Sequence, residues 1–285
     1  MYEQYQDIKR GQNRLSGAKS RAKSRDQKRS SLKSTCYNLA RMFFNAHTYY
    51  AIRKNANANA LTIAGGIFPD FAKTRLISWD DLHKKQGILE FSGFIQKSHP
   101  KYQSFLDGII YHNDLDYTSH NEYKNSKPGY AYATITPPLF DLVKQALKTD
   151  DATTKSLSHN LIESGVDYHL LNQTIEPITL VKDAAGEIDM RELASILSVF
   201  YEKNEDEMFA GVKDFFAFVT RYDLRIIEEW VKLFTDLGTS YLKINVDKEH
   251  IKKALELSFK LTKDTWREYL ETSIASKNTE IKDCN

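Results

Sequence analysis

From Leu39 onward, apolar side chains recur every three or four positions, the spacing that lines one face of an α-helix. The first such run consists of Leu39, Met42, Phe43, Ala46 and Tyr50. The same spacing predicts further helices at 80–97, 101–124, 138–148, 153–172, 189–203, 205–220, 223–237 and 247–276. An alternating, strand-like pattern is convincing only at 130–135. The sequence therefore predicts an all-α fold, a single multi-helix bundle.

Basic residues are concentrated near the N-terminus. Residues 1–41 hold 11 Lys plus Arg and 3 Asp plus Glu, against 29 and 35 in residues 42–285. Because this first segment has few large apolar side chains to bury, we predict a basic, disordered tail. Its charge could bind nucleic-acid phosphates, although a solvated tail without a partner is the simpler interpretation. Met42 also fits a natural start, which would make the preceding residues an upstream extension.

Glycine and proline interrupt the helical pattern at two places. Gly65, Gly66 and Pro69 predict a loop that returns the chain to the core. Pro177 and Gly186 mark a predicted linker. The expected parts are a tail at 1–38, a metal-binding helical core at 39–175 and C-terminal helices packed on that core at 176–285.

Cysteine usage and hydropathy indicate the class of protein. Cys36 and Cys284 lie near opposite ends and form no CxxC pair, which excludes a disulfide scaffold and favours a reducing compartment. No apolar run suits a secretory signal or approaches the roughly 18 residues of a transmembrane span. We therefore expect a cytoplasmic protein without a transmembrane segment.

Histidines and carboxylates share one face of each of two predicted helices. His112, Asp116 and His120 are four residues apart, so their side chains project from a single helical stripe. The pair His159 and Glu163 repeats this spacing. A single histidine and carboxylate four residues apart is common on solvated helices. The combination of the two motifs indicates two ligand-bearing helices that face one volume.

Imidazole nitrogen and carboxylate oxygen suit zinc and the neighbouring first-row metals, and the absence of cysteine pairs argues against a structural zinc site of the cysteine type. Three more residues strengthen the case: His47 on the first helix, Asp70 after the Gly-Gly-x-x-Pro turn, and His83 near the next helix start. The pattern predicts a polynuclear site, in which Asp116 is the best candidate for a bridging ligand.

Aromatic residues surround these motifs. They fit either a cleft wall that stacks on a base or encloses a cation, or ordinary core packing with a solvated hydroxyl, which we favour. They are Tyr49, Tyr50, Trp79, Tyr111, Tyr117, Tyr123, Tyr130 and Tyr132.

Six segments carry a resemblance to a known family. They are MFFNAHTYYAIRK at 42–54, GGIFPDF at 65–71, WDDLH at 79–83, IIYHNDLDYTSH at 109–120, GYAYA at 129–133 and SHNLIESGVDY at 158–168. In their order and joint occurrence they resemble the zinc-dependent phospholipase C superfamily, which also includes single-strand-specific nucleases. The nearest resemblance is to bacterial proteins with a phospholipase C/D domain, and it covers roughly residues 42–172.

The resemblance implies a helical bundle with a trimetal centre in a cleft. The first ion would be held by Asp70, His83, His112 and Asp116. The second would be held by His120, His159 and Glu163. His47 would bind the third, with Asp116 as a bridging ligand. In the secreted lipases, an N-terminal Trp also binds the third metal, and Met42 does not replace it. Either Asp167 or another ligand substitutes here, or the site holds two metals. Asp167 could instead form hydrogen bonds that orient the ligands without contacting the metal itself.

The reaction implied is hydrolysis of a phosphate ester by metal-bound hydroxide, with two or three Zn²⁺ ions stabilising the developing charge. Asp70 is the expected catalytic carboxylate that orients or deprotonates the water. The substrate would be a lipid head group or a nucleotide. The predicted activity is therefore that of a phospholipase C-like phosphodiesterase or, as an alternative, of a nuclease. A di-iron oxygenase also uses helical carboxylates and histidines. A non-catalytic helical binding module is the remaining alternative.

Overall fold

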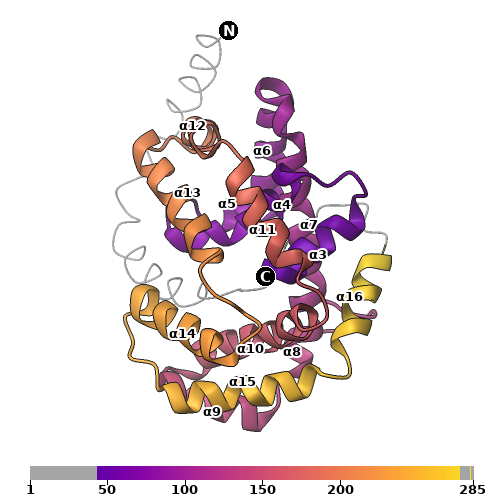
Figure 1. Ribbon diagram of the computed structural model, residues 1–285, viewed down its shortest axis with the longest axis vertical. Helices are drawn as coiled ribbons and strands as arrows, with labels where there is room; N and C mark the ends of the chain where they lie inside the picture. Colours follow the sequence, from indigo (N-terminus) through magenta and orange to yellow (C-terminus); the bar gives the residue numbers. More distant parts are fainter. Residues whose placement is uncertain (1–43, 277–282, 284–285) are drawn as a thin grey trace, which may run out of the picture. The chain divides into compact units, whose positions relative to one another are not determined.

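Figure 1 shows the computed structural model, which describes residues 44–276 and residue 283. The described residues form fourteen α-helices and no strand, which confirms the all-α prediction. The predicted tail at 1–38 lies outside the described residues. The helices are α3 (Phe44–Lys54), α4 (Ala60–Ile67), α5 (Trp79–His83), α6 (Lys85–Ser98), α7 (Gln103–His120), α8 (Tyr130–Thr134), α9 (Pro137–Leu147), α10 (Asp151–Leu171), α11 (Glu176–Glu187), α12 (Met190–Tyr201), α13 (Glu205–Val219), α14 (Ile227–Leu237), α15 (Lys248–Thr262) and α16 (Trp266–Ala275). The other helical segments are the 3₁₀ helices η1 (Phe68–Thr74) and η2 (Pro100–Tyr102) and the π-helix η3 (Gly238–Leu242).

Side-chain caps set where several helices begin. Asn59 accepts a hydrogen bond from the Thr62 amide at the start of α4, and the Thr62 hydroxyl faces the Asn59 amide in return. Asp150 caps α10 by accepting from the Thr153 amide. Each cap satisfies backbone N–H groups that have no partner inside the helix. Ser78, Asp189, Asn204 and Asp247 cap α5, α12, α13 and α15 in the same way.

The predicted loop at Gly65 and Gly66 is wrong, because both glycines lie inside α4. A Cβ on Gly65 would lie 1.9 Å from the carbonyl oxygen of Phe105 on α7. On the opposite helix, a Cβ on Gly108 would lie 2.2 Å from the carbonyl oxygen of Thr62. The absence of a side chain at Gly65 and Gly108 therefore allows α4 and α7 to approach closely, and Gly65 does not form a turn. The chain leaves the α conformation only at the following η1.

Two further expectations are corrected by the structure. Residues Tyr130–Thr134 form α8 rather than a strand, with Tyr130 stacked on Tyr269 at a ring separation of 4.2 Å. The expected linker is the helix α11, since Pro177 stands in its first turn, where a missing N–H costs nothing. Gly186 lies in its last turn, beside open space.

The helices α3, α7 and α10 form the centre of this arrangement (Figure 1). α7 packs against α4, α3 and α6, while α10 packs against α15, α9, α8 and α3. α3 contacts both α7 and α10, which brings the N-terminal motifs to the two ligand-bearing helices. Later helices cover this group, since α11 contacts α3 and α4, and α16 contacts α3 and α10.

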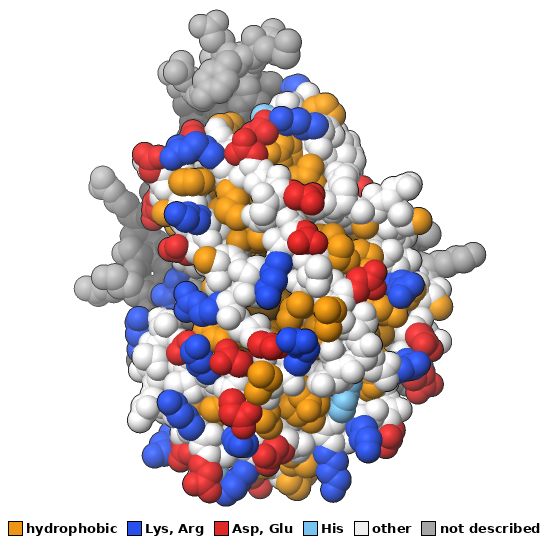
Figure 2. Space-filling view, viewed as in Figure 1, with side chains coloured by type: hydrophobic (Ala, Val, Ile, Leu, Met, Phe, Trp, Pro, Cys, Tyr) orange, Lys and Arg blue, Asp and Glu red, His pale blue; other side chains and the backbone are white. Residues whose placement is uncertain are grey.

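The described helices include none that is both long and apolar enough to cross a bilayer. On the face shown in Figure 2, basic and acidic side chains are interspersed with apolar ones rather than gathered by sign.

Candidate metal centre

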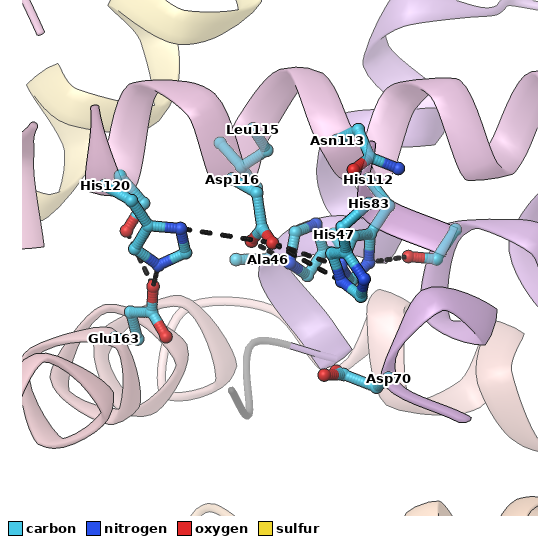
Figure 3. A network of polar contacts seen from close by, with 12 residues as sticks. Ala46, His47, Asp70, His83, His112, Asn113, Leu115, Asp116, His120 and Glu163 are labelled. Atoms are coloured by element: carbon cyan, nitrogen blue, oxygen red, sulfur yellow. Dashed lines mark hydrogen bonds and ion pairs between the residues drawn. The ribbon is translucent and has the colours of Figure 1, made fainter. Parts of the chain in front are cut away.

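Three helices bring their histidines and carboxylates to one buried place (Figure 3). α7 contributes His112, Asp116 and His120 from successive turns, as the four-residue spacing predicts. Helix α3 contributes His47, and α10 contributes the pair His159 and Glu163. All six side chains are buried, with exposed fractions of 0–5%.

The carboxylate of Asp116 stands among four imidazoles. Its Oδ1 lies 3.3 Å from Nε2 of His47, and its Oδ2 lies 3.5 Å from Nε2 of His112. The same Oδ2 is 3.9 Å from Nε2 of His83 and 4.0 Å from Nδ1 of His120. Figure 3 shows Asp116 between His120 on one side and the other three histidines on the opposite side. A carboxylate in this position can contact ions on both sides of it.

Two sets of side chains could each hold a metal ion. We name His47, His112 and Asp116 the first ligand group, and His120, His159 and Glu163 the second ligand group. Within each group, one ligand atom per residue lies within 4.8 Å of the others. Zinc binds nitrogen and oxygen at about 2.0–2.2 Å, so atoms this close can share one ion.

Backbone carbonyls orient two of the imidazoles. Nδ1 of His112 lies 2.8 Å from the carbonyl oxygen of Gly66, and Nδ1 of His83 lies 3.2 Å from that of Trp79. A carbonyl can only accept, so each Nδ1 carries a hydrogen, and the Nε2 of each ring faces Asp116. Metal-binding histidines usually have such a partner behind them. This orientation of the two rings therefore suits metal binding.

Contacts to Glu163 join α7 to α10 within the second ligand group. Its Oε1 accepts from the Ser119 hydroxyl at 2.7 Å and lies 2.6 Å from Nε2 of His120. The ring of His159 lies 4.9 Å from that of His120, at 73°. Ser119 thereby fixes the carboxylate in front of its neighbouring histidines.

His83 and Asp70, the other two predicted ligands, lie beside the first ligand group but outside the two sets. His83 is fully buried and stacks on Trp79 while it faces Asp116. Asp70 is also fully buried, and its Oδ1 lies 2.6 Å from Nζ of Lys73, one turn along η1. The structure thus pairs Asp70 with the ammonium group of a largely buried lysine, which the sequence did not predict.

The centre gathers four buried carboxylates, each 0–1% exposed: Asp70, Asp116, Glu163 and Asp167. Lys73, whose side chain is 9% exposed, offsets one of these charges. Buried carboxylates are strongly unfavourable unless a positive charge or hydrogen bonds compensate them. Divalent cations would compensate the charges of Asp116 and Glu163, which belong to the two ligand groups. The donor set and the charge therefore both fit metal ions.

The electrostatic surroundings leave His47 ready to bind a metal. Burial and the neighbouring His112 lower the pKa of His47 to about 4, so its imidazole is neutral at pH 7. Burial also opposes charge on His112, but Asp116 and Asp70 outweigh it and raise the pKa of that residue. Since a metal ligand must be deprotonated, metal binding at His112 would compete with proton binding.

Asp167 lies behind the ligands rather than among them. Its Oδ1 accepts from the Ala46 amide at 2.8 Å, and its Oδ2 accepts from the backbone and side-chain amides of Asn45 at 3.2 and 3.0 Å. These donors belong to the first turn of α3, where backbone N–H groups need acceptors. Burial raises the pKa of Asp167 to about 7, although the three hydrogen bonds act in the opposite direction. Asp167 thereby holds the turn that carries His47.

We expect Asp167→Asn to weaken zinc binding by about 10–100-fold, the usual effect of losing a group that orients a metal ligand. An amide offers one acceptor oxygen, so its NH₂ group would face one of the α3 donors and displace His47. Zinc affinity measured by chelator competition checks this. Asp264→Asn, in the exposed turn between α15 and α16, is the matched control. Equal affinities in the two variants would show that Asp167 does not position the site.

Sequence reasoning missed Lys73, Ser119 and Asn45. Lys73 follows Asp70 by three residues, and this spacing was the one available signal. Ser119 and Asn45 carry no such pattern, because their partners Glu163 and Asp167 are distant in the sequence. Among the aromatic residues, Tyr50 and Tyr130 are buried as expected, whereas Tyr132 is half-buried beside His159.

The chain matches no protein-family model, and no curated protein or solved structure matches it significantly. The family resemblance in the sequence therefore remains a prediction. The assignment of a function depends on the geometry of this centre.

Proposed function

We propose that the protein is a zinc-dependent phosphoric ester hydrolase, a phosphodiesterase similar to phospholipase C. The observation that carries the proposal is the Asp116 carboxylate within 4.0 Å of four imidazole nitrogens, next to a second histidine and carboxylate group. Nitrogen and oxygen donors without cysteine are typical of catalytic rather than structural zinc sites. Zinc ions bound there would supply an activated water near neutral pH and neutralise phosphoryl oxygens.

The side chains of the protein have separable tasks in this proposal. The first and second ligand groups hold the ions, and Asp116 links the two groups through its position on α7. Asp70 remains our candidate for the carboxylate that orients the attacking water. Lys73 holds Asp70 in place through their 2.6 Å ion pair and adds positive charge where an anionic phosphate would bind.

The donor set favours this function over a di-iron oxygenase. Di-iron carboxylate bundles use a Glu from each of two helices and Glu-x-x-His pairs from the other two. Here histidine precedes each paired carboxylate by four residues, and His47 and His83 add further imidazoles. A purely structural metal site is the remaining alternative, and activity measurements separate it from a catalytic one.

The test combines metal analysis of the purified protein with hydrolysis of a chromogenic phosphodiester. We expect bound zinc and activity, both of which fall sharply in His112→Ala and His159→Ala. His250→Ala is the matched control, since His250 forms a partly exposed ion pair with Asp247 away from both ligand groups. Metal-free protein, or unaltered activity in the first two variants, would defeat the proposal. Iron with an oxygen-sensitive absorption band would favour the oxygenase instead.

A further inference from the structure

A surface pocket of about 370 Å³ lies beside the second ligand group. Its wall is formed by α8, by the start of α9 and by one residue of α10, and includes Tyr132, Ile135, Pro137, Phe140, Asp141 and Lys155. The volume is within the range of small-molecule sites. The pocket therefore has room for one flat group of a substrate.

Tyr132 connects this pocket to the candidate metal centre. Its ring lies 4.7 Å from the ring of His159 and 6.0 Å from that of His120. These two histidines are also the most exposed of the eight predicted ligands, at 3% and 5%, whereas the others are at 0–1%. The least buried ligands of the centre are thus the two histidines that lie beside Tyr132.

The pocket combines aromatic faces with a cation. Tyr132 and Phe140 offer rings on which a flat group can stack, and Ile135 and Pro137 complete an apolar wall. Nζ of Lys155 lies 5.8 Å from the centre of the Tyr132 ring. Lys155 precedes His159 by one turn of α10, so it stands on the same helix face as the ligand. An exposed ammonium there can bind a phosphate.

We propose that this pocket is a nucleotide subsite, in which Tyr132 and Phe140 stack on a base and Lys155 binds a second, non-reacting phosphate. The proposal rests on the hydrolase function and adds its substrate class. The acyl chains of a lipid would meet the charged groups of Lys155 and Asp141 at the rim, which apolar chains avoid. A base meets ring faces there, and Asp141 can accept a hydrogen bond from a ring N–H.

The test uses three dinucleotides with the same reacting phosphodiester: thymidylyl-thymidine, its 5′-phosphorylated form and its abasic analogue, with cleavage followed by chromatography. For the zinc-loaded protein, kcat/KM should rise from the abasic analogue to the base-bearing and then the phosphorylated substrate. Phe140→Ala should lower the ratio of kcat/KM for thymidylyl-thymidine to that for the abasic analogue by about tenfold. Lys155→Gln should remove the preference for the 5′-phosphate, again about tenfold.

Lys148→Gln, an exposed lysine outside the pocket, should leave every ratio unchanged. Equal rates on the three dinucleotides, or ratios unaffected by Phe140→Ala and Lys155→Gln, would overturn the subsite while leaving the hydrolase proposal intact. Faster cleavage of phosphatidylcholine micelles than of any dinucleotide would also overturn it, in favour of a lipid substrate. Absence of hydrolysis of every diester, the chromogenic one included, would overturn both.

Discussion

Asp116→Asn should lower kcat/KM for phosphodiester hydrolysis by more than about 100-fold. This exceeds the roughly 10–100-fold effect of losing a group that only orients a metal ligand. Among the described residues, Asp116 is the carboxylate that lies within 4.0 Å of His47, His83, His112 and His120. An amide of the same shape removes the charge and one of the two oxygens that face these imidazoles. The bound zinc should fall with the activity, because both ions are expected to depend on this residue.

The change Asp107→Asn is the matched control for Asp116→Asn. Asp107 lies on the same helix α7, but it is half-exposed and accepts a hydrogen bond from Gln103. We expect its zinc content and activity to equal those of the wild type. A fully active, zinc-replete Asp116→Asn protein would show that the imidazoles converge for a structural reason alone.

Gly108→Ala should destabilise the fold by about 3 kcal/mol or more, the upper range for overpacking a well-filled core. The added Cβ would lie 2.2 Å from the carbonyl oxygen of Thr62 and 2.6 Å from the backbone nitrogen of Gly66. Backbone atoms cannot rotate away, so α4 and α7 would have to separate. Thermal unfolding should show Tm lowered by about 6–12 °C.

Separation of α4 from α7 should also displace ligands of the metal centre. His112 lies one turn after Gly108, and its Nδ1 contacts the carbonyl oxygen of Gly66 on α4. We therefore expect Gly108→Ala to weaken zinc binding as well. Gly93→Ala is the control, since Gly93 is an exposed glycine of α6, and a Cβ added to it would meet no atom within 4 Å. It should gain up to about 1 kcal/mol from helix propensity. A Tm of Gly108→Ala equal to that of Gly93→Ala would contradict the close approach of α4 and α7.

Helical periodicity predicted the parts of the centre that lie along one helix. The spacing of His112, Asp116 and His120 sufficed to place three side chains on one stripe, since a helix face depends on local geometry alone. The same holds for His159 and Glu163 on α10. Their meeting with one another depends on packing between helices, and the sequence could only suggest it through the resemblance to a family.

Local signals failed where tertiary contacts decide the conformation. Gly65 and Gly66 favour a turn in isolation, yet the contact with Phe105 makes glycine the residue that this helix crossing needs. The apolar alternation from Tyr130 imitates a strand, whereas stacking on Tyr269 from α16 holds a short helix. The three-residue spacing of Asp70 and Lys73 permitted an ion pair, but nothing in the local sequence indicated that this pair would lie beside the metal centre.

Diffraction from zinc-soaked crystals at the zinc absorption edge tests the central claim most directly. We expect two anomalous peaks in the buried centre, one among His47, His112 and Asp116 and the other among His120, His159 and Glu163. Each peak should lie about 2.0–2.2 Å from the ligand atoms. Peaks confined to surface histidines such as His250, with none at these two groups, would contradict a metal centre at this place.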